Sequence, residues 1–154
     1  MDYFSDLKET VARALDEDVQ GHDITAQIIN ETTSATARVI SRETAIICGQ
    51  PWVDEVARQV DPNLTVTWYF KDGDQVHEND LLFKVQGRAR SILTAERTML
   101  NFLQSLSGTA TQTHSYVNLI CDTDTAILDT RKTIPGLRLG QKYAVHIGGA
   151  VNHR

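Results

Sequence analysis

Residues 88–106 read RARSILTAERTMLNFLQSL, and this stretch separates two parts of the sequence that have different patterns. Its apolar residues recur at steps of three and four, which predicts an amphipathic helix with one buried face. They are Ile92, Leu93, Met99, Leu100, Leu103 and Leu106. Because serine and glycine often follow the last turn of a helix, we expect this helix to end at Ser107 and Gly108 and a second helix to follow over 109–121.

The residues before this helix alternate between helix and strand patterns. The expected elements begin with a helix over 2–17, which residues 21–23 prevent from continuing, and two short strands or one bent strand within 34–48. A helix that starts at Gly49 and Pro51, a strand over 64–70, a turn at 71–74 and a strand over 81–85 follow. This mixture predicts an α+β module.

The pattern changes after the long helix. Residues 126–128 form a short continuous apolar run, which predicts a buried strand of a parallel sheet. A polar loop is expected over 129–136, and residues 143–147 suit a short helix or strand before a pair of glycines. These features are typical of the opening of an array in which strands and helices alternate.

The composition argues against several classes of protein. A formal net charge of −5 disfavours a general nucleic-acid surface. Cys48 and Cys121 do not form a CxxC pair, so we expect free, buried thiols in a reducing compartment. The first ten residues lack the apolar region of a signal peptide and no apolar run approaches a membrane span, which predicts a cytoplasmic protein. The scattered histidines lack metal-ligand spacing, so no metal site is expected within the chain.

The polar segment 129–133, DTRKT, carries the clearest signal for chemistry. Its adjacent cations, Arg131 and Lys132, directly follow the predicted strand, where they are costly to bury unless an anion lies there. Active sites of α/β barrels gather at this end of the strands, and arginine offers a planar fork to a carboxylate or phosphate. The alternative is a solvated turn, which charge type alone favours because loop cations are common.

Two further signals are weak when each is taken alone. The glycine pair at 148–149 permits close approach of the backbone to a ligand, and His153 and Arg154 follow it, although they could equally form a polar tail. Arg97 lies at the edge of the apolar stripe of the long helix, where a surface arginine is the simpler interpretation.

Six strings, in this order and spacing, resemble the quinolinate phosphoribosyltransferases, a family also called nicotinate-nucleotide pyrophosphorylases (carboxylating). They are ALDEDVQGHDIT at 14–25, DGDQV at 72–76, LTAERTMLNFLQSLSGTAT at 93–111, DTRKTIPGLR at 129–138, KYAV at 142–145 and GGAVNHR at 148–154. One string is a moderate signal, whereas six in order over nearly the whole chain outweigh the simpler interpretations above.

The resemblance implies an α+β N-terminal open sandwich domain, followed by the start of a TIM-like α/β barrel that the chain does not complete. It assigns 1–107 to the N-terminal domain, which includes the long helix, and 108–154 to a linker helix and the first part of the barrel. Family members convert quinolinate and phosphoribosyl pyrophosphate to nicotinate mononucleotide, pyrophosphate and carbon dioxide with Mg²⁺, in NAD biosynthesis. They form dimers in which the N-terminal domain of one subunit helps to close the other's active site, so a homodimer or a higher homo-oligomer of dimers is expected.

The resemblance also assigns roles to individual residues. Four cations would surround the quinolinate carboxylates: Arg97, Arg131, His153 and Arg154, with Arg97 reaching across the dimer interface. Lys132 would contact phosphate or pyrophosphate and Thr130 would offer a hydroxyl group, while Arg131 and Lys132 are the expected catalytic residues. Ala150 stands where the family commonly has a third glycine.

The Mg²⁺ ligands are expected beyond residue 154, so the chain alone is expected to be inactive. Two alternatives remain: a related pyridine-carboxylate or molybdenum-transport-associated protein, and a non-catalytic dimerisation module. The set of cations fits a dicarboxylate better than a monocarboxylate.

Overall fold

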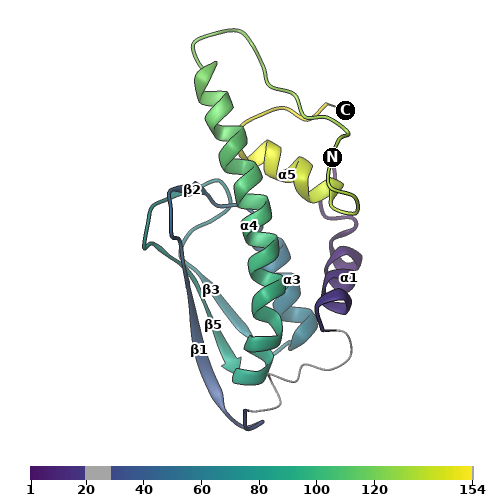
Figure 1. Ribbon diagram of the computed structural model, residues 1–154, viewed down its shortest axis with the longest axis vertical. Helices are drawn as coiled ribbons and strands as arrows, with labels where there is room; N and C mark the ends of the chain where they lie inside the picture. The colour runs from purple at the N-terminus through teal and green to yellow at the C-terminus, as the bar shows by residue number, and fades with distance from the viewer. Residues whose placement is uncertain (20–28, 154) are drawn as a thin grey trace.

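The structure of the chain is a computed structural model that describes residues 1–19 and 29–153. A small sheet lies on one side of the molecule, and one long helix runs along most of its length (Figure 1). The elements are α1 (Leu7–Val19), β1 (Ser34–Ile40), β2 (Ala45–Ile46), α3 (Gln50–Val60), β3 (Thr65–Trp68), β4 (Gln75–Val76), β5 (Leu81–Arg88), α4 (Ala89–Leu119) and α5 (Arg138–Ile147). The interruption expected at 21–23 lies outside the described residues, as does Arg154. Cys48 is buried as expected, whereas Cys121, just after the end of α4, is exposed.

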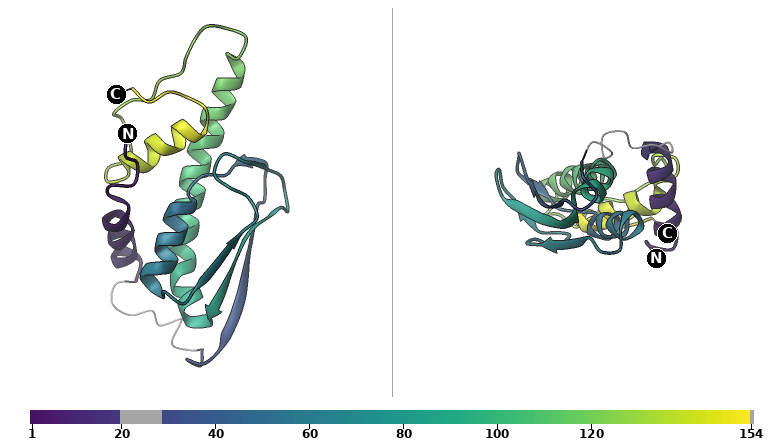
Figure 2. Two further views of the ribbon diagram at one scale, coloured as in Figure 1. Left: turned by 180° about the vertical axis from the view of Figure 1, so that it is seen from behind. Right: turned by 90° about the horizontal axis from the view of Figure 1, so that it is seen from below.

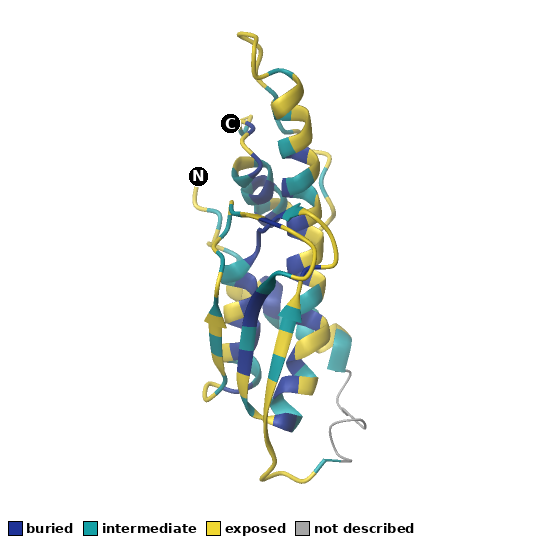
Figure 3. Cartoon of the chain, turned by 90° about the vertical axis from the view of Figure 1, so that its left-hand side faces the viewer, coloured by how far each residue is buried: buried dark blue, intermediate teal, exposed yellow. Residues whose placement is uncertain are grey.

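The sheet has three antiparallel strands in the order β1–β5–β3, and a separate ribbon joins β2 to β4. The middle strand β5 buries Leu82, Phe83 and Val85, and Figure 3 shows it between two more exposed strands. Helices α3 and α4 cover one face of this sheet, and no helix in the described part of the chain covers the other (Figure 2). This is a small sheet with helices on one side, and the segment 34–48 forms two strands rather than one bent strand.

Helix α4 runs for 31 residues through Ser107 and Gly108, so the prediction that a helix ends there is wrong. The Ser107 hydroxyl accepts a hydrogen bond from the Cys48 backbone N–H (3.0 Å) and donates one to the Cys48 carbonyl (3.1 Å). An exposed glycine inside a helix costs about 1 kcal/mol relative to alanine, which the buried contacts on either side offset. Neither this helix nor any other in the described residues is apolar enough over a sufficient length to cross a membrane.

Asp72, in the turn before β4, ties α5 to the N-terminal part of the chain. Its carboxylate accepts the backbone N–H groups of Gly49 (3.0 Å) and Gln50 (3.1 Å) at the start of α3, and also the Tyr143 hydroxyl of α5 (2.8 Å). Burial raises the pKa of Asp72, although these hydrogen bonds act against that rise. The ring of Tyr143 also lies 5.5 Å from that of the fully buried Trp52. The position of α5 is therefore fixed by its contacts with Asp72 and with Trp52 of α3.

Among the described residues after α4, Leu128 and Val151 form one parallel β-bridge. Helix α5 lies between these two residues in the sequence. The parallel direction agrees with the prediction for 126–128, but burial does not, because Leu128 is 53% exposed. The two segments bridge at one position only and bury too little surface to form the core strand that their composition suggested. Residues 143–147 lie within α5, so of the two expected alternatives, a short helix or a strand, the helix is confirmed.

Replacing Gly108 by alanine is expected to raise the free energy of unfolding by about 1 kcal/mol. A Cβ added at Gly108 meets no heavy atom within 4 Å, and the residue lies well inside α4. Urea denaturation of the chain measures the change. A loss of stability would contradict a continuous helix, because a helix that ended here would use glycine for a left-handed residue.

Gly148→Ala is the matched comparison and is expected to destabilise the chain. A Cβ at Gly148 would lie 2.6 Å from the Ala110 carbonyl oxygen and 2.6 Å from Thr113 Cβ, so α4 and the residues that follow α5 would have to separate. Overpacking of this kind typically costs about 1–3 kcal/mol. Equal effects of the two substitutions would mean that α5 is not packed on α4 as described.

Candidate anion-binding site

A cavity of about 180 Å³ lies where α4 and α5 meet the loop after Leu128. Its lining residues are Thr109, Asp129, Thr130, Lys132, Thr133, Gln141, Lys142 and Val145. Hydroxyl groups, an amide and two lysines thus face one space, with a single carboxylate among them. These are donors that suit an anion, provided that the carboxylate is neutralised.

The carboxylate of Asp129 is neutralised by Lys142. Their side chains are 4% and 7% exposed, and Lys142 Nζ lies 2.5 Å from Asp129 Oδ2. Burial acts to raise the pKa of Asp129, but the hydrogen bonds from Lys142 and from the backbone of His153 outweigh it, so this pKa lies below its usual range. Asp129 is therefore a buried, charged acceptor.

The same carboxylate binds the end of the described chain. Asp129 Oδ2 also accepts a hydrogen bond from Asn152 Nδ2 (3.0 Å), and Oδ1 accepts one from the His153 backbone N–H (2.7 Å). The Asn152 side chain in turn donates to the Lys142 carbonyl (2.9 Å) and accepts from the Tyr3 hydroxyl (2.5 Å). The loop, α5 and residues 151–153 thus meet at one polar centre.

The structure brings some of the expected site residues together. Thr130 and Lys132 line the cavity, and the Thr130 hydroxyl accepts the Lys132 backbone N–H at 3.0 Å, which shapes the loop. Arg131 is exposed next to them, and its carbonyl accepts a hydrogen bond from Arg138 (3.4 Å). The backbone N–H of His153 donates a hydrogen bond to Asp129, while Arg154 is outside the described residues.

Arg97 is not brought to this cavity within one chain. It lies on α4 twelve residues before Thr109, which at the rise of an α-helix is about 18 Å along the axis. Its guanidinium group pairs with Asp18 of α1 at 2.8 Å, and its side chain is 72% exposed. Within one chain, Arg97 therefore does not reach this cavity.

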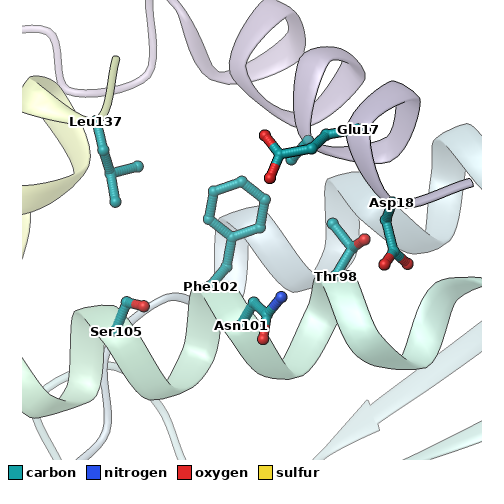
Figure 4. Close-up of a pocket in the computed structure, with 8 residues that line it drawn as sticks. Glu17, Asp18, Thr98, Asn101, Phe102, Ser105 and Leu137 are labelled. Atoms are coloured by element: carbon teal, nitrogen blue, oxygen red, sulfur yellow. The ribbon is translucent and has the colours of Figure 1, made fainter. Parts of the chain in front are cut away.

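A second cavity, of about 260 Å³, lies between α1 and α4 close to this pair. Figure 4 shows Glu17 and Asp18 of α1 above Thr98, Asn101, Phe102 and Ser105 of α4. With two carboxylates and no cationic side chain among the described residues of its lining, it suits an anion poorly. The cavity at Lys132 is therefore the better candidate for an anion.

Two residues of the site, Asp129 and Lys142, were missed by reasoning from the residues alone, which treated them only as parts of longer strings. A signal was nevertheless present. Lys142 lies three residues from both Leu139 and Val145, so it shares a helical face with apolar residues. A lysine on a packed face needs an anionic partner, and Asp129 is the acidic residue at the end of the nearest apolar run.

Comparison with known proteins identifies the class of protein to which this fold belongs: transferases of a phosphoribosyl group. Two family models match, the quinolinate phosphoribosyl transferase N-terminal domain over residues 23–107 and the C-terminal domain over residues 109–154. The chain belongs to the quinolinate phosphoribosyltransferase family.

Individual relatives agree with this assignment. The chain is 44% identical to "Quinolinate phosphoribosyltransferase [decarboxylating] 2b, mitochondrial" of Nicotiana tabacum, over 97% of this chain and 42% of that protein. It is 42% identical to the nicotinate-nucleotide pyrophosphorylase [carboxylating] of Mycobacterium leprae, over 98% of this chain and 55% of that protein. The solved nicotinate-nucleotide pyrophosphorylase from Francisella tularensis superposes with a TM-score of 0.92 at 51% identity, over 96% of this chain and 53% of that one. The chain thus spans about half the length of the relatives it matches.

Asp129→Asn is expected to lower the free energy of unfolding at pH 7 by about 3 kcal/mol or more, because Lys142 then stays buried without its partner. The pKa of Asp129 is lowered by folding, so its stabilisation is present above the unfolded-state value of about 3.9 and is lost as pH falls through the folded pKa. The difference in unfolding free energy between Asp129→Asn and the unmodified chain should therefore become smaller below about pH 4.

Urea denaturation at neutral and at acidic pH tests this expectation. The exposed Asp124, replaced by asparagine, is the control and should change stability little at either pH. A destabilisation by Asp129→Asn that is the same at both pH values would contradict a charged, paired Asp129 in the folded chain.

Proposed function

We propose that this chain is the N-terminal half of a quinolinate phosphoribosyltransferase, which joins quinolinate to the ribosyl group of phosphoribosyl pyrophosphate and releases pyrophosphate and carbon dioxide. The observation that carries the proposal is the cavity lined by Lys132 and Thr130, next to Arg131 and His153, in a chain of this family. A molybdenum-transport-associated relative or a dimerisation module is less well supported, because the matched family and the named relatives are quinolinate enzymes.

The chemistry of quinolinate accounts for these residue types. Its two carboxylates require fixed cations in a site shielded from water, and Arg131, His153 and Arg154 are the proposed partners within the chain. Lys132, as a compact charge on the cavity wall, is proposed to contact a phosphate or pyrophosphate, with Thr130 as a hydroxyl donor. Transfer through an oxocarbenium-like state then needs positioning and charge stabilisation rather than a covalent enzyme intermediate.

A homodimer is part of the proposal. The exposed Arg97 lies about 18 Å along α4 from the cavity of its own chain, too far to contact the same small ligand. We propose that it reaches the cavity of a second copy and supplies a further cation there. Its side chain is 72% exposed, and reaching a second copy would require it to leave its ion pair with Asp18.

Mg²⁺ is proposed to bind outside these residues. The described part of the chain holds no group of three or more His, Cys, Asp or Glu side chains that could hold a metal ion. The carboxylate of the cavity, Asp129, already accepts hydrogen bonds from Lys142, Asn152 and His153. The donor set here fits an anion, and the Mg²⁺ ligands are proposed to lie beyond residue 154.

The parallel bridge Leu128↔Val151 with α5 between its sides is proposed to be the opening of the α/β barrel. Under this proposal residues 1–107 are the N-terminal domain, and 108–154 are a linker and the first barrel elements, although α4 runs through the boundary without a break. Because two bridged segments do not close a barrel, the 154 residues alone should bind substrate without turning it over.

Calorimetric titration of quinolinate into the chain is expected to show binding that Arg131→Ala weakens at least tenfold, since a charge-assisted contact is worth about 1.5–3 kcal/mol. Arg42→Ala, at an exposed arginine between β1 and β2, is the control and should leave binding unchanged. The same titration is repeated with the chain completed to the length of its relatives. If neither form binds quinolinate, the proposed function is wrong.

A further inference from the structure

We propose that Asp129 is a positioning residue of this site, an inference that rests on the proposed function. It accepts three hydrogen bonds from groups 13 to 24 residues further along the sequence: Lys142 Nζ in α5, Asn152 Nδ2 and the His153 backbone N–H. The expected cations Arg131 and Lys132 follow Asp129 closely in the sequence, and His153 is bonded to Asp129 through its backbone. Asp129 therefore sets the distance between the loop 130–132 and His153.

The pair with Lys142 makes this role compatible with an anionic ligand. An unpaired carboxylate on the wall of an anion site would repel quinolinate or pyrophosphate. With Lys142 at 2.5 Å, and both side chains almost fully buried, the two charges cancel at the cavity wall. Lys142 is then committed to Asp129, so its contribution is geometric, and Lys132 remains the lysine that faces the ligand.

The N-terminal segment completes the arrangement. The Tyr3 hydroxyl donates to Asn152 Oδ1, which leaves the Asn152 amide nitrogen directed to Asp129 and to the Lys142 carbonyl. The ring of Tyr3 is held by stacking on His146 at 5.8 Å and by an edge contact with Tyr143 at 5.5 Å. Tyr3 lies before residue 23, where the family match begins, so this contact adds a part of the chain that the match does not include.

A purely structural role for the pair is the alternative, and it predicts a different result. If the pair only stabilises the fold, removal of both charges should leave ligand affinity close to its original value, since a buried pair replaced by neutral groups of similar size often costs no stability. If Asp129 sets the geometry, the same double substitution should keep the fold and lose affinity.

The experiment uses the chain completed to the length of its relatives, with quinolinate as the ligand. The double variant Asp129→Asn with Lys142→Met is expected to keep its thermal unfolding temperature close to that of the unmodified protein. The dissociation constant and the KM for quinolinate should rise about tenfold or more. An unchanged dissociation constant in the folded double variant overturns the inference.

Tyr3→Phe tests the same geometry without altering any charge, and decides the matter if the double variant does not fold. Loss of one hydrogen bond to Asn152 should raise the dissociation constant about two- to tenfold. Tyr116→Phe, at an exposed tyrosine of α4, is the matched control and should have no effect. Binding that is unaltered in Tyr3→Phe counts against the inference. If the unmodified protein does not bind quinolinate, the proposed function fails and the inference fails with it.

Discussion

The buried ion pair between Asp129 and Lys142 organises the part of the chain that follows α4. Sheet hydrogen bonding is sparse there, because Leu128 and Val151 form one parallel bridge and both are about half exposed. A buried pair adds little stability compared with apolar residues, but a misplaced partner is costly, so the pair favours one geometry strongly over others. In this chain it does what a longer strand pairing would otherwise do: it fixes two loops and a helix relative to one another.

The hydrogen bonds around Asp129 keep their geometry because α5 is held firmly against the N-terminal part of the chain. Three kinds of contact hold it: the close approach of Gly148 to α4, the hydrogen bond from Tyr143 to Asp72, and the contact of the Tyr143 ring with Trp52. Asp72 also caps α3, so the same carboxylate orients a helix of the N-terminal core and a helix of the site. A substitution that shifts the start of α3 is therefore expected to shift α5 and the cavity that α5 lines.

Much of this arrangement can be predicted from the sequence, and the exceptions share a cause. The existence of α1, α4, β3 and β5 follows from local periodicity, which depends on side chains a few residues apart, although α1 begins at Leu7 rather than at residue 2. The continuation of α4 through Gly108 depends instead on bonds between Ser107 and Cys48, 59 residues away. Likewise, Lys132 is expected from charge and position and Thr130 from the family resemblance, but Lys142 acquires its meaning only when the fold brings Asp129 to it.

The electrostatics of the N-terminal domain bear on how a complete site can form. Arg97 lies on a part of α4 whose neighbours on α1 include Glu17 and Asp18, and the cavity beside it is lined by both carboxylates. A dicarboxylate held by Arg97 in that position would be repelled by the acidic wall, whereas the cavity at Lys132 presents lysines, hydroxyl groups and a neutralised Asp129. Within one chain these are two separate places with opposite preferences for charge. If one ligand contacts both Lys132 and an Arg97, as we propose, that arginine must extend away from its own acidic surface and toward the cavity of a second chain.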